Sequence, residues 1–208
     1  MASAATIKVP AQIEFGNIRV KLTDKARAKV QEDVDRLMRH ASSYEQQAAK
    51  ARLHMPLVMQ VLREEQVPED FKYLAMQESN FVADAVSKSK AVGYWQFKAA
   101  TGKEMGLRID GQVDERMNLV SATRAACKYL KTNNFYFDNW VYTLLSYHEG
   151  RTGATPQTKK SYYGKNQMTI DHKMHWYVLR NFAHKIAFEA ILKQSKASDG
   201  QLVAYRNG

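Results

Sequence analysis

Apolar side chains recur at helical spacing along most of this chain. From residue 24 onward they return every three or four positions, which is the spacing that gives a helix one buried face. Glycine is absent from residues 17–92, and Pro56 and Pro68 fall inside that segment, where each favours the first turn of a new helix. The pattern predicts about eight helices, over approximately residues 24–41, 44–54, 56–62, 68–78, 93–106, 114–130, 138–150 and 172–193.

Three other segments lack the helical pattern. Residues 1–21 alternate partly between apolar and polar side chains, which predicts an extended arm laid against the domain. Residues 79–92 are small and polar, and residues 150–170 contain several glycines and Pro156, so both predict loops. The chain is therefore expected to be all-α, with an extended arm and accessory helices over 1–54, a main helical domain over 55–194 and a flexible tail over 195–208.

The composition is that of an ordinary globular protein. Hydrophobic residues make up 45% of the 208 positions and charged residues 25%, which argues against a disordered chain. The formal net charge of +10 suits a nucleic acid, an anionic membrane surface or an anionic polymer. Basic and acidic residues alternate, as in residues 24–27, and no block of Lys and Arg stands out, so we expect no nucleic-acid partner.

What the sequence lacks narrows the choice of protein class. No stretch approaches the roughly 18 consecutive apolar residues that a membrane-spanning helix needs. Cys127 is the single cysteine, which excludes an internal disulfide and a four-cysteine zinc site, and we expect it to be buried. The first residues carry no visible export signal, so the chain is either cytoplasmic or a sequence from which such a signal was removed.

Glu78 is a carboxylate in an unusual position. It follows the apolar run from Tyr73 to Met76 and precedes the polar loop that begins at Ser79. The dipole of a helix disfavours a negative charge at its C-terminal end, and partial burial raises the pKa of a carboxyl further. A carboxyl with a raised pKa suits a general acid. The pattern alone leaves an exposed glutamate at a helix end as the alternative.

Four blocks of sequence follow one another over the middle of the chain. They are YLAMQESNF at residues 73–81, VGYWQFKAATG at 92–102, DERMNLVSATRAACKYLK at 114–131 and DNWVYTLLSYHEG at 138–150. In this order they resemble the bacterial peptidoglycan lytic transglycosylases of the soluble and membrane-bound murein types, a branch of the goose-type lysozyme superfamily. The resemblance implies a lysozyme-like catalytic domain over 55–194, with additional N-terminal helices before it.

The resemblance also implies roles for five residues. Glu78 matches the family's sole catalytic acid and base, and Tyr147 matches a tyrosine whose hydroxyl points at the reacting centre. Ser87 and Ser89 match polar positions that line the groove and orient the glutamate or a substrate amide. Gln96 matches a groove residue that hydrogen-bonds the sugar chain.

The sequence departs from the family at the end of the fourth block. The family usually has Tyr-Asn-x-Gly, whereas His148 and Glu149 stand here between the tyrosine and the glycine. Glu149 is either a surface residue at a helix end or a second carboxylate that positions water. It lies two residues beyond Tyr147, about 200° around a helix, so we expect it to face away from the groove. Together with Ser79, which follows Glu78 directly, His148 and Glu149 are additional candidates for the site.

Two weaker groups of residues complete the candidates. His172 and His175 have a spacing that can bind a metal on one helix, but no further ligand is evident, so we expect no metal and no cofactor. Four aromatic residues of the C-terminal half either stack on sugar rings or fill the core, and they are Tyr162, Tyr163, Trp176 and Tyr177.

The reaction that the resemblance implies is cleavage of the β-1,4 bond between N-acetylmuramic acid and N-acetylglucosamine in peptidoglycan, with 1,6-anhydromuramoyl products. A hydrolytic muramidase of the same fold and a catalytically weak peptidoglycan-binding protein remain alternatives. Peptidoglycan lies outside the inner membrane, so the expected location is the periplasm or cell envelope. We expect a monomer whose partner is the glycan strand, with membrane association only through a removed signal or lipid anchor.

Overall fold

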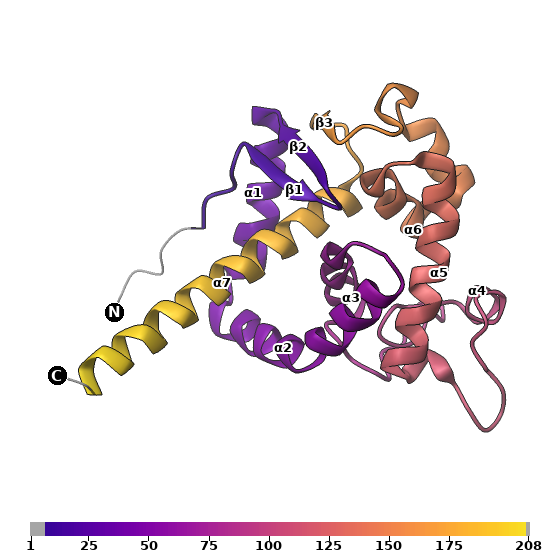
Figure 1. Cartoon of the computed structure of the whole chain (residues 1–208), viewed down its shortest axis with the longest axis horizontal. Helices are drawn as coiled ribbons and strands as arrows, with labels where there is room; N and C mark the ends of the chain where they lie inside the picture. Colours follow the sequence, from indigo (N-terminus) through magenta and orange to yellow (C-terminus); the bar gives the residue numbers. More distant parts are fainter. Residues whose placement is uncertain (1–6, 207–208) are drawn as a thin grey trace.

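The helical spacing of the sequence is realised in seven α-helices among the described residues (Figure 1). A computed structural model describes residues 7–206, with side chains described as far as Lys193. The helices are α1 (Asp24–Met38), α2 (Ala41–Glu64), α3 (Lys72–Ser79), α4 (Ala99–Glu104), α5 (Leu119–Phe137), α6 (Trp140–Ala154) and α7 (Trp176–Arg206). Short 3-10 helices are η1 (Glu69–Phe71), η2 (Glu115–Met117), η3 (Thr155–Gln157) and η4 (Lys160–Tyr162), and the strands are β1 (Gln12–Phe15), β2 (Ile18–Leu22) and β3 (Gln167–Ile170). The chain is mostly helical, as the sequence predicts.

The N-terminal arm is a β-hairpin, so the all-α prediction is incomplete. β1 and β2 pair antiparallel, and β3, which lies in a segment predicted to be a loop, joins β2 in parallel. Alternate side chains of each strand are buried, which accounts for the partial alternation in the sequence. Gly16 and Asn17 form the turn with φ values of 57° and 63°, as a two-residue type I′ hairpin requires.

Residues 41–64 form one helix, α2, where the sequence predicted two helices separated at Pro56. A proline inside a helix cannot donate a hydrogen bond, and its ring opposes the carbonyl four residues earlier, at a cost of about 3 kcal/mol. Buried side chains nevertheless continue on both sides of Pro56, mostly three or four residues apart, and they are Tyr44, Ala48, Ala51, Met55, Val58, Val61 and Leu62. Burial of this continuous face outweighs the local cost of the proline.

The bounds of several helices differ from the prediction, and α4 begins at Ala99 instead of near residue 93. α6 continues to Ala154, although Gly150 breaks its helical conformation with φ 67° and ψ 167°, at the residue where the sequence predicted the end. α7 begins at Trp176 rather than at His172, and it extends to Arg206, through the segment for which a flexible tail was expected. Mobility of residues 195–208 stays a prediction, because the side chains beyond Lys193 and residues 207–208 lie outside the described part.

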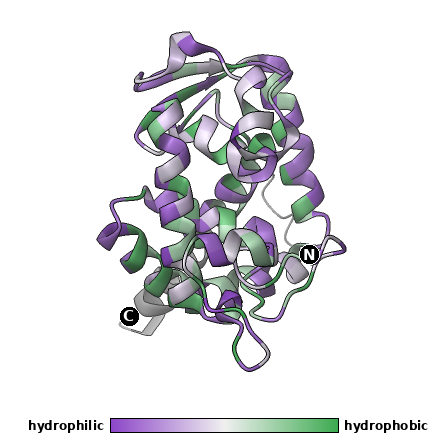
Figure 2. Ribbon diagram, turned by 90° about the vertical axis from the view of Figure 1, so that its right-hand side faces the viewer, coloured by the Kyte–Doolittle hydropathy of each residue, from purple (hydrophilic) through white to green (hydrophobic). Residues whose placement is uncertain are grey.

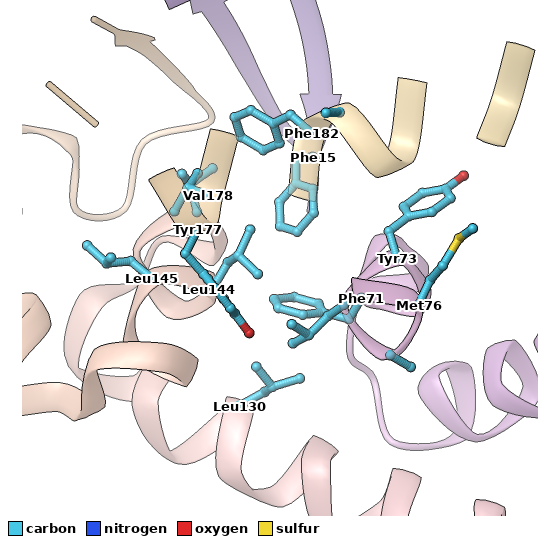
Figure 3. Packing of buried hydrophobic residues seen from close by; sticks show 14 of the residues in the cluster. Phe15, Phe71, Tyr73, Met76, Leu130, Leu144, Leu145, Tyr177, Val178 and Phe182 are labelled. Atoms are coloured by element: carbon cyan, nitrogen blue, oxygen red, sulfur yellow. The ribbon is translucent and has the colours of Figure 1, made fainter. Parts of the chain in front are cut away.

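Helix α7 ties the N-terminal elements to the rest of one core. It contacts α1, α2, α3 and α6 along its length (Figure 1). Phe15 of β1 packs on Phe182 of α7 and on Phe71 of η1, with ring centroids 5.6 and 5.3 Å apart (Figure 3). Cys127 of α5 is buried, as predicted. This shared core fixes the start of α7 relative to the end of α3.

The helices are amphipathic rather than uniformly apolar. Hydrophilic and hydrophobic residues stand side by side along them (Figure 2). In α1, for example, the buried positions are Ala26, Val30 and Val34, and the residues between them are polar or charged for the most part. Within residues 7–206 no helix is long and apolar enough to cross a membrane.

Candidate active site

A cleft of about 410 Å³ opens at the C-terminal end of α3. It brings together the five residues that the resemblance singled out, which are Glu78, Ser87, Ser89, Gln96 and Tyr147. His148 also lines the cleft, and its remaining walls are Ala91, Phe97, Lys98, Thr101, Tyr129 and Gly150. Segments that are far apart in the sequence therefore meet at one concave surface, which is where a ligand site is expected.

Glu78 is held in the last turn of α3 by the way that helix ends. Asn80 follows in the left-handed conformation, with φ 50°, and its amide donates to the carbonyl of Met76 at 2.9 Å. Burial of the Glu78 carboxyl raises its pKa from the ordinary 4.5 to about 7. The carboxyl is thus partly protonated near neutral pH, as a residue that both donates and accepts a proton requires.

Tyr177, at the start of α7, is the partner of Glu78. Its hydroxyl donates a hydrogen bond to Oε1 of Glu78, and this bond lowers the pKa of the carboxyl, against the larger effect of burial. Figure 3 shows the ring of Tyr177 passing Leu144, with its hydroxyl directed into the interior. Sequence reasoning named Tyr177 only as an aromatic for sugar stacking or packing. The separation of 99 positions in sequence between Tyr177 and Glu78 left no local signal of the contact.

The wall opposite Glu78 is a loop that hydrogen-bonds to itself. The hydroxyls of Ser87 and Ser89 lie 3.1 Å apart, and Oγ of Ser87 accepts from the amide of Ala91 at 3.0 Å. Gln96 has a positive φ of 50°, and its Nε2 donates to the carbonyls of Ala85 and Gly93. The amide group of Gln96 is therefore fixed in the cleft with both of its donors engaged by the loop.

Ser79 connects α3 to this loop. The side chain is buried, and its hydroxyl donates to the carbonyl of Tyr94 at 2.9 Å. Ser79 is not among the residues that line the cleft. Its position suits a residue that holds Glu78 against the loop, not one that contacts a ligand.

Tyr147 and His148 form the α6 side of the cleft. The hydroxyl of Tyr147 donates to the carbonyl of Trp95 at 2.8 Å, and burial together with the nearby Glu78 raises its pKa well above 10.0. The ring of His148 stacks on Tyr177 with centroids 4.6 Å apart, and burial lowers its pKa. His148 thus covers the tyrosine that hydrogen-bonds to Glu78.

Glu149 does not line the cleft, as the helical geometry predicted. Its Oε1 lies 3.6 Å from Nε2 of His148 and 3.4 Å from Nε2 of His175. His172 is not part of this cluster, and its carbonyl accepts from Lys29. His172 and His175 do not share a helix face, because both residues precede α7, which begins at Trp176 and not at His172 as predicted.

The other C-terminal aromatic residues do not reach the cleft. Tyr162 and Tyr163 are partly buried against the core. Trp176 is 49% exposed and packs beside His148 and His175, with ring centroids 5.2 and 5.4 Å away. Among the four aromatic candidates, Tyr177 hydrogen-bonds to one cleft residue, Glu78, and Trp176 packs against another, His148.

Comparison with known proteins finds relatives that are named as transglycosylases. The chain is 27% identical over 175 residues to the membrane-bound lytic murein transglycosylase D of Escherichia coli strain K12, a match that covers 81% of this chain and 38% of that protein. It is 40% identical over 79 residues to the peptidoglycan transglycosylase gp16 of Escherichia phage T7, covering 37% of this chain and 6% of that protein. It is also 27% identical over 107 residues to a putative tributyltin chloride resistance protein of Alteromonas sp. strain M-1, covering 50% and 52% of the two chains.

The chain thus spans less than two fifths of the length of its Escherichia coli relative. Its residues 55–170 match the family described as the transglycosylase SLT domain. The matched segment contains Glu78, the loop opposite it and the α6 side of the cleft, and it covers more than half of the 208 residues. The chain therefore belongs to the transglycosylase SLT domain family.

Proposed function

We propose that this chain cleaves the β-1,4 bond between N-acetylmuramic acid and N-acetylglucosamine in peptidoglycan by intramolecular transglycosylation. The observation that carries the proposal is Glu78, the only carboxylate among the described residues that line the cleft, with a pKa raised to about 7. Most glycosidases use two carboxylates, and a reaction with one requires the substrate to supply the second group. Membership of the transglycosylase family supports the same substrate.

In the first step Glu78 acts as an acid. Its proton passes to the glycosidic oxygen, the bond from that oxygen to the anomeric carbon breaks, and the carboxylate is left behind. The N-acetyl group of the muramoyl residue attacks the anomeric carbon from the substrate itself. Tyr177 donates to Oε1 of Glu78, so it stabilises the carboxylate as the negative charge forms.

In the second step Glu78 acts as a base. It takes the proton of the 6-hydroxyl of the same muramoyl residue, whose oxygen closes on the anomeric carbon and displaces the acetamido oxygen. Glu78 recovers its proton, and no water is consumed. Closure within one sugar is strongly favoured over attack by water, since tethered groups reach effective molarities of about 10⁵ M or more.

The ends of the products test this reaction. Digests of purified peptidoglycan, treated with borohydride and analysed by mass spectrometry, should contain 1,6-anhydromuramoyl ends that resist reduction. A majority of reducible muramic acid ends would make the enzyme a hydrolytic muramidase. Binding to peptidoglycan without new ends of either kind would make the chain a binding protein.

Replacing Glu149 with glutamine should leave both the rate and the product ends unchanged. Glu149 contacts His148 and His175 and does not line the cleft, so it has no position from which to activate water. The comparison is the fraction of anhydro ends in parallel digests by the parent and the variant. Reducible ends in the parent digest that disappear in Glu149→Gln would show that this carboxylate directs hydrolysis.

Replacing Tyr177 with phenylalanine should move the alkaline limb of the activity profile to higher pH. The first step needs protonated Glu78, so activity should fall as pH rises through about 7 in the parent. The hydrogen bond from Tyr177 lowers the pKa of Glu78, and its removal raises that pKa. The measurement is kcat/KM on peptidoglycan from about pH 5 to pH 9, a range that brackets this pKa. An unchanged or downward-shifted limb would contradict the role of Tyr177.

The same proposal places the chain in the cell envelope or periplasm, where peptidoglycan is found. The Escherichia coli relative is named as membrane-bound, which supports an envelope location. Glycan strands of peptidoglycan are the proposed partner. The formal net charge of +10 and Lys98 in the cleft wall suit the carboxylates of muramoyl peptides.

A further inference from the structure

Two imidazoles and one carboxylate converge beside the cleft, outside the residues that the proposed reaction uses. Glu149 lies on α6, next to His148, and His175 immediately precedes α7. One potential ligand atom from each of the three residues lies within 4.8 Å of the other two. The side chains are partly accessible, with exposed fractions of 40% for His148, 28% for Glu149 and 18% for His175.

Two distances in this cluster are close to those between neighbouring ligands of one metal ion. Oε1 of Glu149 is 3.6 Å from Nε2 of His148 and 3.4 Å from Nε2 of His175. In a tetrahedral zinc site with bonds of about 2.0–2.1 Å, neighbouring ligand atoms stand about 3.3–3.4 Å apart. Glu149 contacts both imidazoles at ion-pair distance, and no hydrogen bond joins its carboxylate to either ring in the described part of the chain.

We propose that His148, Glu149 and His175 form a binding site for a divalent transition metal such as Zn²⁺. Imidazole nitrogen and carboxylate oxygen favour Zn²⁺, Co²⁺ or Ni²⁺ over Mg²⁺ and Ca²⁺, which take oxygen ligands. Three protein ligands leave a fourth position for water or for an external group. Since His148 also lines the cleft, the ion stands at its rim.

The surroundings of the cluster limit how its ligands move. The ring of His148 is stacked on Tyr177. Gly153 leaves room for Glu149, because a Cβ at that glycine would lie 3.3 Å from Cβ of the glutamate. The amide of Tyr177 donates to Nδ1 of His175 at 3.3 Å. When a metal binds at Nε2 of His175, the proton of the ring moves to Nδ1. Nδ1 can then no longer accept from the amide of Tyr177, so this long hydrogen bond is lost.

Metal titration of the untagged full chain tests the site. We expect one Zn²⁺ per chain by isothermal titration calorimetry, and a visible absorption band of low-symmetry Co²⁺ when Co²⁺ is used as the probe. Glu149→Gln and His175→Ala should weaken binding by about 100-fold or more, because loss of an outer-shell partner alone costs 10–100-fold. His172→Ala is the matched control and should bind as the parent does, since His172 lies outside the cluster.

The fluorescence of Trp176 gives a second, independent test of where the ion binds. Its ring centroid is 5.2 Å from that of His148 and 5.4 Å from that of His175, so bound Co²⁺ should quench its fluorescence. Trp176→Phe should keep the Co²⁺ absorption band and lose this quenching.

Three results would overturn the proposal: absence of the Co²⁺ band in the parent, equal binding by Glu149→Gln and the parent, or loss of binding in His172→Ala. Circular dichroism of each variant checks its fold. Should His175→Ala fail to fold, Glu149→Gln still decides the question. These binding measurements do not depend on cleavage of peptidoglycan, so the metal site and the proposed function can fail separately.

Discussion

Replacing Glu78 with glutamine is expected to abolish cleavage of purified peptidoglycan. The amide has nearly the same shape as the carboxyl, but it can neither give a proton to the glycosidic oxygen nor take one from the 6-hydroxyl. Proton transfer by a positioned side chain contributes about 10²–10⁴-fold in rate, and here both steps depend on one residue. Release of soluble muropeptides, measured by chromatography, should fall at least to about one hundredth of the parent rate.

The same substitution should not destabilise the fold. The pKa of Glu78 is raised by burial to about 7 in the folded chain, from an ordinary value of 4.5. Below the lower value the carboxyl is protonated in both the folded and the unfolded chain. Between the two values the unfolded chain ionises first, so the free energy of unfolding of the parent falls as pH rises and levels off above about 7.

Glutamine does not ionise, so the free energy of unfolding of Glu78→Gln does not fall in this way as pH rises. Its free energy of unfolding should exceed that of the parent by up to about 3 kcal/mol near pH 8, and the two should converge near pH 4. Urea titrations at both pH values measure the difference. A folded Glu78→Gln that keeps more than about one per cent of the parent rate would refute the role of Glu78 as sole acid and base.

The parts of the fold that sequence reasoning recovered are those with a local signal. Helix α1 shows its buried face directly in the spacing of Ala26, Val30 and Val34. Glu78 stood out because it follows an apolar run and precedes a polar loop, and the four ordered blocks placed the loop and α6 beside it. Such features are properties of neighbouring residues, so a single sequence carries them.

The parts that were missed depend on contacts between distant residues. β3 pairs with β2 although the two strands are far apart in sequence, with Arg19 opposite Gln167, and nothing near Gln167 marks it as a strand. The hydrogen bond from Tyr177 to Glu78 and the approach of His175 to Glu149 arise only when α7 packs beside α3 and α6. The helix break predicted at Pro56 is wrong, because burial of the continuous apolar face of α2 outweighs the local cost of the proline.

Gly93 shows how closely the loop of the site is packed against the rest of the domain. It has a positive φ of 84°, its amide donates to the carbonyl of Ala85, and its own carbonyl accepts from Nε2 of Gln96. Behind it lies the backbone of Arg116, a buried residue that is paired with Asp114. The close approach of two backbones leaves no space for a side chain, which explains the glycine in the second sequence block.

Replacing Gly93 with alanine should therefore be among the most destabilising single changes in this chain. The new Cβ would lie 1.9 Å from the carbonyl oxygen of Arg116, and a backbone atom cannot move aside as a flexible side chain can. The left-handed backbone adds about 1–2 kcal/mol and the overpacking about 1–3 kcal/mol, so we expect the free energy of unfolding to fall by about 2–5 kcal/mol. Cleavage should fall with it, because Gln96 loses its anchor in the cleft.

Gly111→Ala is the matched control for this change. No heavy atom lies within 4 Å of the Cβ that it would add, so its free energy of unfolding should stay within about 0.5 kcal/mol of the parent value. Urea titrations of the parent and the two variants give the comparison directly. Equal stability of Gly93→Ala and Gly111→Ala would mean that the site loop does not lie against the backbone of Arg116. The description of this side of the cleft would then be wrong. A large loss in Gly93→Ala alone, together with a parallel loss of cleavage, ties the shape of the cleft to this single close approach.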